Sequence, residues 1–278
     1  MKIGIVGLGL IGGSLALDLT DRGHYLVGVS RSDMTCEKAV RRDIVKEAGA
    51  SFALVKGCEL IFICTPIEFI LPTLSQLVPY LSPHTVVTDV GSVKGSIVNQ
   101  GKHLWSNFVG SHPMAGTANQ GIDAVEENLF FQAPCIITPD DHTPASAIAL
   151  IEKIWSSVGC EIITTTPEIH DQAVAWISHL PVMISANLIN SCLGEKNEQI
   201  KKFAQKIASS GFRDTSRVGG GNPELGLMMV RNNKENLLNS LKQYQQNLEL
   251  LINNIEQEQW QEITNLLTTA QNHRSKYL

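Results

Sequence analysis

The chain has 278 residues, a length that suits two modest domains, each with its own core. Its 43% hydrophobic and 18% charged residues are ordinary for a globular protein. A net charge of −5 gives no electrostatic footprint for nucleic acid or an acidic membrane surface, so neither is expected as a partner. The six cysteines are scattered without a CxxC pair, so we expect a cytoplasmic protein with neither a disulfide framework nor a metal site.

The first element is an apolar run at residues 3–6, followed by a glycine-rich turn and a helix-compatible segment at 14–19. Strand, glycine turn and helix in this order are what a Rossmann dinucleotide site requires. A signal peptide is disfavoured because Asp18 follows the run and no A-x-A cleavage pattern is present. A membrane span is disfavoured by the glycines and by the short length. We expect the cofactor pyrophosphate to contact Gly7, Gly9, Leu10, Ile11 and Gly12.

The second strand is expected at residues 25–29 and ends at Ser30-Arg31-Ser32. In NAD sites, an acidic residue at the end of this strand binds the ribose 2′-hydroxyl. Here hydroxyls and a guanidinium occupy the position, and these groups bind a 2′-phosphate that a carboxylate would repel. Ser30, Arg31 and Ser32 therefore favour NADP, and nearby Asp33 leaves NAD as the alternative.

Strands and helices alternate along the chain to about residue 164. We expect further strands at 60–64, 86–90, 108–109, 134–138 and 160–164, and helices at 37–48, 69–81 and 144–158. This order predicts an α/β, Rossmann-type fold with a doubly wound parallel sheet, whose ligands lie at the carboxyl ends of the strands. The loop of Cys64, Thr65 and Pro66 should lie over the nicotinamide half of the cofactor. Ser92 and His112 come just past two other strand ends, so both are site candidates.

The composition changes at Thr166-Pro167-Glu168, where an N-cap residue, a proline and an acid begin a helix. Only helical patterns follow, so we expect a cofactor domain at 1–165 and an all-α domain at 166–278. The first helix carries His179 and then Pro181, which should kink it. A histidine beside a kink is a site candidate, and a buried structural histidine is the alternative.

Two features of the helical region indicate binding surfaces. Arg213 and Arg217 lie in the glycine-rich segment 211–223 and could clamp a carboxylate, or could pair with Asp214 or face water. Further on, apolar residues recur at spacings of four and three, as in an a/d seam. A domain of about 110 residues barely covers such a helix, so we expect a homodimer. The seam residues are Leu237, Leu241, Tyr244, Leu248, Leu251 and Ile255.

Five motifs, GLGLIGGS, DVGSVK, GSHPMAGT, SHLP and GFRDTSR, follow one another across essentially the whole chain. The set resembles the prephenate/arogenate dehydrogenase family, and GSHPMAGT is its most specific part. The length and the Ser-Arg pair are most similar to the NADP-dependent arogenate dehydrogenases of cyanobacteria. The resemblance implies oxidative decarboxylation of L-arogenate to L-tyrosine with hydride transfer to NADP⁺, in tyrosine biosynthesis. The alternative is prephenate as substrate, which would give 4-hydroxyphenylpyruvate.

The resemblance also implies roles for individual residues. His112 would accept the proton of the substrate hydroxyl, as neutral histidine can near pH 7, with Ser92 as its hydrogen-bonding partner. Arg217 would hold the ring carboxylate, and Asp214 would orient Arg217. The other residues that the resemblance places at the substrate are His179 and Thr117.

Two departures from the family pattern leave arogenate and prephenate both open. Ala118 stands where many members have an acid, and Pro223-Glu224-Leu225-Gly226 has no aromatic residue at the PxxW position. We expect neither a chorismate mutase segment before the Rossmann start nor an ACT domain after residue 278, so tyrosine feedback would act at the active site.

Two other interpretations stay open. A β-hydroxyacid dehydrogenase or a pyrroline-carboxylate reductase also joins a Rossmann half to a helical half. The hydroxyacid enzymes use a lysine on a helix of the second domain, and this chain has none between Ala173 and Leu193. A non-catalytic NADP sensor would bind the cofactor and turn over no cyclohexadienol.

Overall fold

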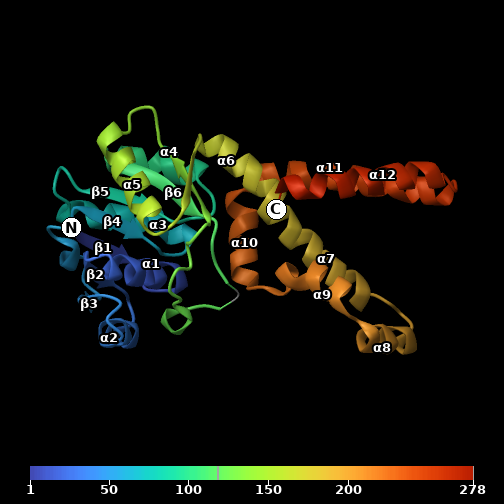
Figure 1. Cartoon of the computed structure of the whole chain (residues 1–278), viewed down its shortest axis with the longest axis horizontal. Coiled ribbons are helices and arrows are strands. Elements are labelled where there is room, and N and C mark those ends of the chain that lie inside the picture. Colours follow the sequence, from blue (N-terminus) through green and yellow to red (C-terminus); the bar gives the residue numbers. More distant parts are fainter. Residues whose placement is uncertain (118, 278) are drawn as a thin grey trace.

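A mixed sheet organises the first half of the structure, a computed structural model that describes residues 1–117 and 119–277. In these residues the sheet has eight strands in the order β3-β2-β1-β4-β5-β6-β7-β8 (Figure 1). The strands from β3 to β6 run parallel, β7 is antiparallel to β6, and β8 is parallel to β7. The strands are β1 Lys2–Val6, β2 Tyr25–Val29, β3 Glu47–Gly49, β4 Leu60–Ile63, β5 Val86–Asp89, β6 Phe108–Pro113, β7 Pro134–Thr138 and β8 Glu161–Thr164.

Helices cover both faces of this sheet because successive strand residues point to opposite faces. Ile3 and Ile5 of β1 pack with α1 and α5, whereas Val6 packs with α3 and α4 on the other face. The sequence prediction of a doubly wound Rossmann-type sheet followed by helices is confirmed. The helices and short 3₁₀ turns of this half are α1 Leu10–Asp21, α2 Asp33–Arg41, η1 Phe52–Val55, α3 Ile67–Leu77, η2 Val78–Tyr80, α4 Gly95–Leu104, η3 Ile122–Ala124 and α5 Ala145–Ser157.

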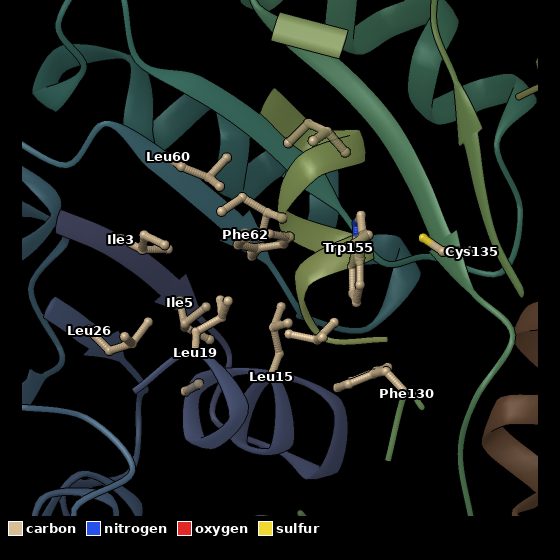
Figure 2. Close-up of a cluster of buried hydrophobic side chains, with 14 of the residues drawn as sticks. Ile3, Ile5, Leu15, Leu19, Leu26, Leu60, Phe62, Phe130, Cys135 and Trp155 are labelled. Atoms are coloured by element: carbon tan, nitrogen blue, oxygen red, sulfur yellow. The ribbon is translucent and has the colours of Figure 1, made fainter. Parts of the chain in front are cut away.

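The hydrophobic cluster between the sheet and helices α1 and α5, here called the first core, contains Trp155 of α5 (Figure 2). Its ring meets Phe62 and Phe130 edge-on, with centroid distances of 5.5 and 5.3 Å. Its indole Nε1 donates a hydrogen bond to Ser111 Oγ at 3.1 Å, so the buried tryptophan leaves no polar atom unpaired. Since Ser111 immediately precedes His112 in β6, the core supports the strand that carries the candidate base.

The helix expected at residues 37–48 is wrong in its bounds. α2 begins at Asp33, where Ser32 Oγ accepts a hydrogen bond from Thr35 N at 3.2 Å and caps the helix. The chain turns at Asp43, which has a φ of 56°, and then forms β3 beside β2. This short edge strand, Glu-Ala-Gly, has no apolar run, which is why sequence periodicity did not predict it.

The described part of the second half, residues 166–277, contains helices joined by short loops and no strand. Thr166 caps its first helix by accepting a hydrogen bond from Ile169 N at 3.3 Å. α11 and α12 extend as a long arm away from the sheet (Figure 1). The elements are α6 Pro167–Val174, η4 Ala175–His179, α7 Leu180–Leu193, α8 Glu198–Ile207, α9 Ser210–Ser216, η5 Arg217–Gly220, α10 Pro223–Asn232, α11 Lys234–Glu256, α12 Trp260–His273 and η6 Arg274–Tyr277.

The helix that carries Pro181 continues through the proline, and a π-helical segment, η4, joins α6 to α7 just before it. A π segment of this kind is frequent at functional sites. The resulting helix, Pro167–Leu193, is long and apolar enough to cross a membrane by length and composition alone, a test that core helices of soluble proteins also pass. It carries buried His170, Asp171 and His179, which are hydrogen-bonded within the protein.

Candidate active site

The glycine turn after β1 leaves room for a phosphate group. Gly7 has a φ of 105°, and a Cβ at Gly12 would lie 2.0 Å from Gly7 O, so the turn and helix α1 require glycine at both positions. A Cβ at Gly9 would meet nothing within 4 Å. The open space therefore lies at the N-terminus of α1, where backbone N–H groups and the helix dipole favour an anion.

Two further loops lie at the same edge of the sheet, at the carboxyl ends of β2 and β4, the strands on either side of β1. After β2, Ser30 Oγ accepts a hydrogen bond from Ser32 N at 3.3 Å, and the exposed Arg31 guanidinium lies 5.7 Å from the centre of the Phe69 ring. After β4, Thr65 Oγ1 is buried and has no hydrogen-bond partner among the described residues. A buried hydroxyl without a partner is costly, so Thr65 fits a site that a bound group completes. These loops, with the glycine turn, fit a dinucleotide cofactor.

His112 lies inside β6 rather than past the end of a strand, so that prediction is wrong. β6 pairs with β5 only at Phe108 and Val109, and then continues beside antiparallel β7, where His112 faces Ile136. The side chain is 9% exposed, and its Nδ1 lies 2.8 Å from His170 Nε2. Burial, together with nearby His170 and Lys94, lowers the pKa of His112 well below its usual range, so the ring is neutral at pH 7.

Asp171 connects the two halves of the chain at this point. Its Oδ1 accepts hydrogen bonds from Lys94 N at 2.7 Å and lies 2.8 Å from His170 Nδ1, and its Oδ2 accepts from Gly95 N at 2.8 Å. A helical-half carboxylate thus caps the N-terminus of α4 in the sheet half. Asn233 Nδ2 donates to the backbone oxygen of Asp171 at 2.7 Å, which adds the N-terminus of α11 to the network.

His179 completes the cluster from the last position of the π segment. It is fully buried, and its Nδ1 lies 3.2 Å from Asn233 Nδ2. Its Nε2 is buried without a hydrogen-bond partner among residues 1–117 and 119–277. Burial lowers the pKa of His179 to about 4, so this ring too is neutral at pH 7. An unpaired donor or acceptor is therefore available to a ligand in the core of the cluster.

A buried ion pair holds the backbone on either side of the cluster. Lys94 Nζ contacts Asp89 Oδ2 and donates to Ser111 O at 2.9 Å, while Asp89 Oδ2 also accepts from Gly91 N at 2.8 Å. Burial lowers the pKa of Lys94, and the adjacent Asp89 opposes that shift. The pair ties the loop after β5 to the strand that carries His112.

The other candidate residues are not joined to this cluster by hydrogen bonds or ion pairs within the described chain. Ser92 is half-buried in the loop between β5 and α4, and the partner found for His112 is His170 instead. Thr117 Oγ1 accepts a hydrogen bond from Asn119 N at 3.2 Å, and Ala118 lies outside the described residues. The substrate roles of Ser92 and Thr117 stay predictions.

Arg217 is exposed at the start of η5, a segment tied to α7 through Ser185. Ser185 Oγ donates to Thr215 O at 2.9 Å and accepts from Gly219 N at 2.9 Å. Asp214 forms its ion pair with Arg213 at 3.4 Å, and the described residues contain no ion pair between Asp214 and Arg217. The structure thus leaves the guanidinium of Arg217 directed to solvent or to a ligand.

Comparison with known proteins identifies the kind of site this is. Residues 15–164 match the model of the prephenate dehydrogenase nucleotide-binding domain, and residues 166–269 match that of the prephenate dehydrogenase dimerization domain. The chain belongs to the prephenate dehydrogenase family. As a member of this family it is an oxidoreductase with a nucleotide-binding half and a dimerization half.

Three relatives illustrate the similarity. The crystal structure of Synechocystis arogenate dehydrogenase is 56% identical, with a TM-score of 0.90 and full coverage of both chains. Prephenate dehydrogenase from Aquifex aeolicus, solved with hydroxyphenyl propionate and NAD⁺, is 28% identical, with a TM-score of 0.93 over 99% of this chain and 98% of that one. A cyclohexadienyl dehydrogenase from Zymomonas mobilis is 33% identical over 85% of this chain and 82% of the relative.

The sequence motifs did not identify His170, Asp171 and Asn233 as site residues. His170 and His179 are nine residues apart, about two and a half turns of α-helix, which would place them on opposite faces. The π segment between them changes the phase, and both rings join one network. The only local signal was the His-Asp pair one turn after the helix cap.

Proposed function

We propose that this chain oxidatively decarboxylates L-arogenate to L-tyrosine with NADP⁺ as the hydride acceptor. The observation that carries the proposal is the 56% identity, over the full length of both chains, to an arogenate dehydrogenase. A buried, neutral His112 beside a dinucleotide cradle supports the same chemistry. Ser30, Arg31 and Ser32, with no carboxylate at the end of β2, support NADP over NAD.

The residues have defined tasks in this reaction. Bound NADP⁺ supplies the acceptor for the hydride that leaves the carbinol carbon. His112 takes the hydroxyl proton, and it returns that proton to the phenolate oxygen formed when the ring loses CO₂. Ser92 lies near the substrate hydroxyl and Thr117 near the ring, His179 contacts the substrate, and Arg217 holds the ring carboxylate. The products balance as tyrosine, CO₂ and NADPH, and His112 ends neutral.

We further propose a homodimer built through the helical domain at residues 166–278, with residues 1–165 as the cofactor domain. The seam of α11 supports it, since Tyr244, Leu248 and Ile255 are 39%, 44% and 50% exposed in the single chain. All six cysteines are free thiols, which supports a cytoplasmic enzyme.

The deciding experiment is a two-by-two assay of arogenate or prephenate, each with NADP⁺ or NAD⁺, followed by the absorbance of the reduced nicotinamide. We expect activity with arogenate and NADP⁺, and His112→Asn should lower kcat by at least ~10²-fold, while exposed His84→Asn should leave it unchanged. Turnover of prephenate alone would overturn the substrate assignment. Cofactor binding without any turnover would favour a non-catalytic sensor.

A further inference from the structure

We infer that Asp171 and its neighbours set opposite tautomers in the two site histidines. In this arrangement His112 carries its proton on Nδ1 and presents a bare Nε2, whereas His179 carries its proton on Nε2. One ring is then a ready acceptor and the other a ready donor. His170, Asp171 and Asn233 are the positioning residues, and the catalytic use of the arrangement rests on the function proposed above.

The tautomer of His112 follows from Asp171 through His170. The Asp171 carboxylate accepts from two backbone N–H groups, so it is an acceptor toward His170 Nδ1 at 2.8 Å as well. His170 Nδ1 therefore carries the proton, and in the neutral ring Nε2 is left as an acceptor. The contact at 2.8 Å then requires His112 Nδ1 to donate, which leaves the lone pair of His112 on Nε2.

His170 lies between Asp171 and His112 in this chain of contacts. His170 is 2% exposed, and the titratable groups around the cluster are Lys94 of the loop before α4, His112 of β6, His179 of η4 and Asp171 of α6. A second proton on His170 would reverse the contact with His112 and put the proton of His112 on Nε2. The tautomer of His112 therefore tests the direction of the whole chain of hydrogen bonds.

The tautomer of His179 follows from Asn233. The carbonyl oxygen of Asp171 can only accept, so the atom of the Asn233 amide that faces it at 2.7 Å is the donor Nδ2. The other side of that amide agrees, because Asn233 Oδ1 accepts from Asn236 Nδ2 at 2.8 Å. Nδ2 then also donates to His179 Nδ1 at 3.2 Å, and the proton of His179 lies on Nε2, the buried nitrogen without a partner.

Opposite tautomers suit a substrate that loses a proton at one end and carries oxygen acceptors at the other. His112 Nε2 takes the hydroxyl proton, and the resulting imidazolium keeps its Nδ1–H on His170, which in turn is hydrogen-bonded to Asp171. No second proton moves, and Nε2 returns its proton to the phenolate oxygen. His179 Nε2–H donates to an oxygen of the substrate, such as a carboxylate.

The first test measures the tautomers directly by long-range ¹⁵N–¹H correlation of imidazole-labelled, full-length protein without substrate. The signals are assigned with His112→Asn and His179→Asn. We expect a protonated Nδ1 in His112 and a protonated Nε2 in His179. The same tautomer in both rings, or a proton on His112 Nε2, would overturn the inference, and this result does not depend on any turnover.

The second test compares two substitutions at His170. Gln presents one acceptor and one donor and can keep the direction of the hydrogen-bond chain, whereas Phe keeps a ring and loses both nitrogens. We expect His170→Phe to lower kcat by about 10²-fold or more with KM within about threefold, and His170→Gln to retain activity within about tenfold. Equal losses in both variants would overturn the positioning role.

A matched pair on α6 separates the charge of Asp171 from general damage to the helix. Asp171→Asn should lower kcat by about 10²- to 10⁴-fold, as for a carboxylate that fixes a catalytic tautomer, and should shift His112 toward the Nε2–H form. Glu168→Gln removes an exposed acid one turn earlier and should leave kcat unchanged. An Asp171→Asn protein with unchanged His112 signals would contradict the inference.

Discussion

The two halves of the chain bury their apolar side chains to very different extents. In the sheet half, Ile5, Phe62 and Trp155 are fully buried, and helices close both faces of the sheet. In the helical half, Leu237 is buried, but Leu248 and Trp260 are 44% and 59% exposed. The sheet half thus completes a core from its own residues, whereas the helical half leaves its seam exposed in the single chain, as the proposed homodimer requires.

The same comparison explains where the site lies. The sheet half supplies the cofactor cradle and His112, and the helical half supplies His170, Asp171 and His179. The closed core fixes one side of the cluster, through Trp155 and Ser111, and the capped N-terminus of α4 fixes the other to Asp171. Substitutions confined to one half, or to the cluster between the halves, should therefore affect cofactor binding, dimerization and catalysis separately.

The largest effect is expected from a matched pair of tryptophans. Trp155→Ala should lower the free energy of unfolding by about 3–5 kcal/mol, because it opens a cavity in the first core and leaves Ser111 without the indole donor. Trp260→Ala, at an exposed position on α12, should have a far smaller effect on the sheet half. Urea unfolding of both variants measures the difference, and equal losses would contradict a self-contained sheet half.

The seam of α11 can be broken without touching the sheet. Leu248→Asp places a charge on the exposed apolar stripe, and it should convert the dimer to a monomer because burying an unpaired charge is costly. Gln246→Asp adds the same charge on the same exposed helix outside the seam and should remain dimeric. Sedimentation measures both, and NADP⁺ affinity should be retained. A native protein that sediments as a monomer would refute the proposed dimer through the seam of α11.

The sheet half was largely predictable because its central strands are short, mostly apolar runs, and β1, β4 and β5 are followed within three residues by Gly7, Pro66 and Gly91. β3 was missed because an edge strand of Glu-Ala-Gly carries no such run, and the extension of β6 to Pro113 was missed because it depends on pairing with β7 about two dozen residues later. Long-range pairing decides where His112 lies, and local sequence holds no record of it.

The site was predictable in part. The GSHPMAGT and SHLP motifs indicated His112 and His179, but not the residues to which their rings are hydrogen-bonded. His170 and Asn233 reach their partners across 58 and 62 residues, and the π segment that brings His170 and His179 together has no periodic signature. Asp214 pairs with its exposed neighbour Arg213 in the single chain, and the orientation of Arg217 by Asp214 stays a prediction.

A smaller effect, confined to the sheet half, is expected at the end of β2. Arg31→Ala should weaken NADP⁺ binding by roughly 1.5–3 kcal/mol, the strength of a hydrogen bond to a charged group, and should affect NAD⁺ much less. Arg41→Ala removes an exposed arginine from the end of α2 and serves as the control. Titration calorimetry with both cofactors measures the difference, and equal losses would exclude contact between Arg31 and the 2′-phosphate.

The smallest effect is a pH dependence that arises where the two halves meet. Burial lowers the pKa of His179 from 6.5 to about 4, so between these values the unfolded chain binds a proton that the folded chain does not. Stability should therefore be full above pH 6.5 and fall as the pH drops toward 4, by on the order of 1 kcal/mol per pH unit for this histidine. His112, whose pKa is also lowered by burial, changes the stability in the same direction.

Urea unfolding midpoints at pH 7, 6 and 5 measure this effect. The midpoint should change less with pH in His179→Asn than in the native protein, while exposed His84→Asn should keep the native pH dependence. Identical slopes in all three proteins would mean that His179 gains its proton without opening the boundary between the halves.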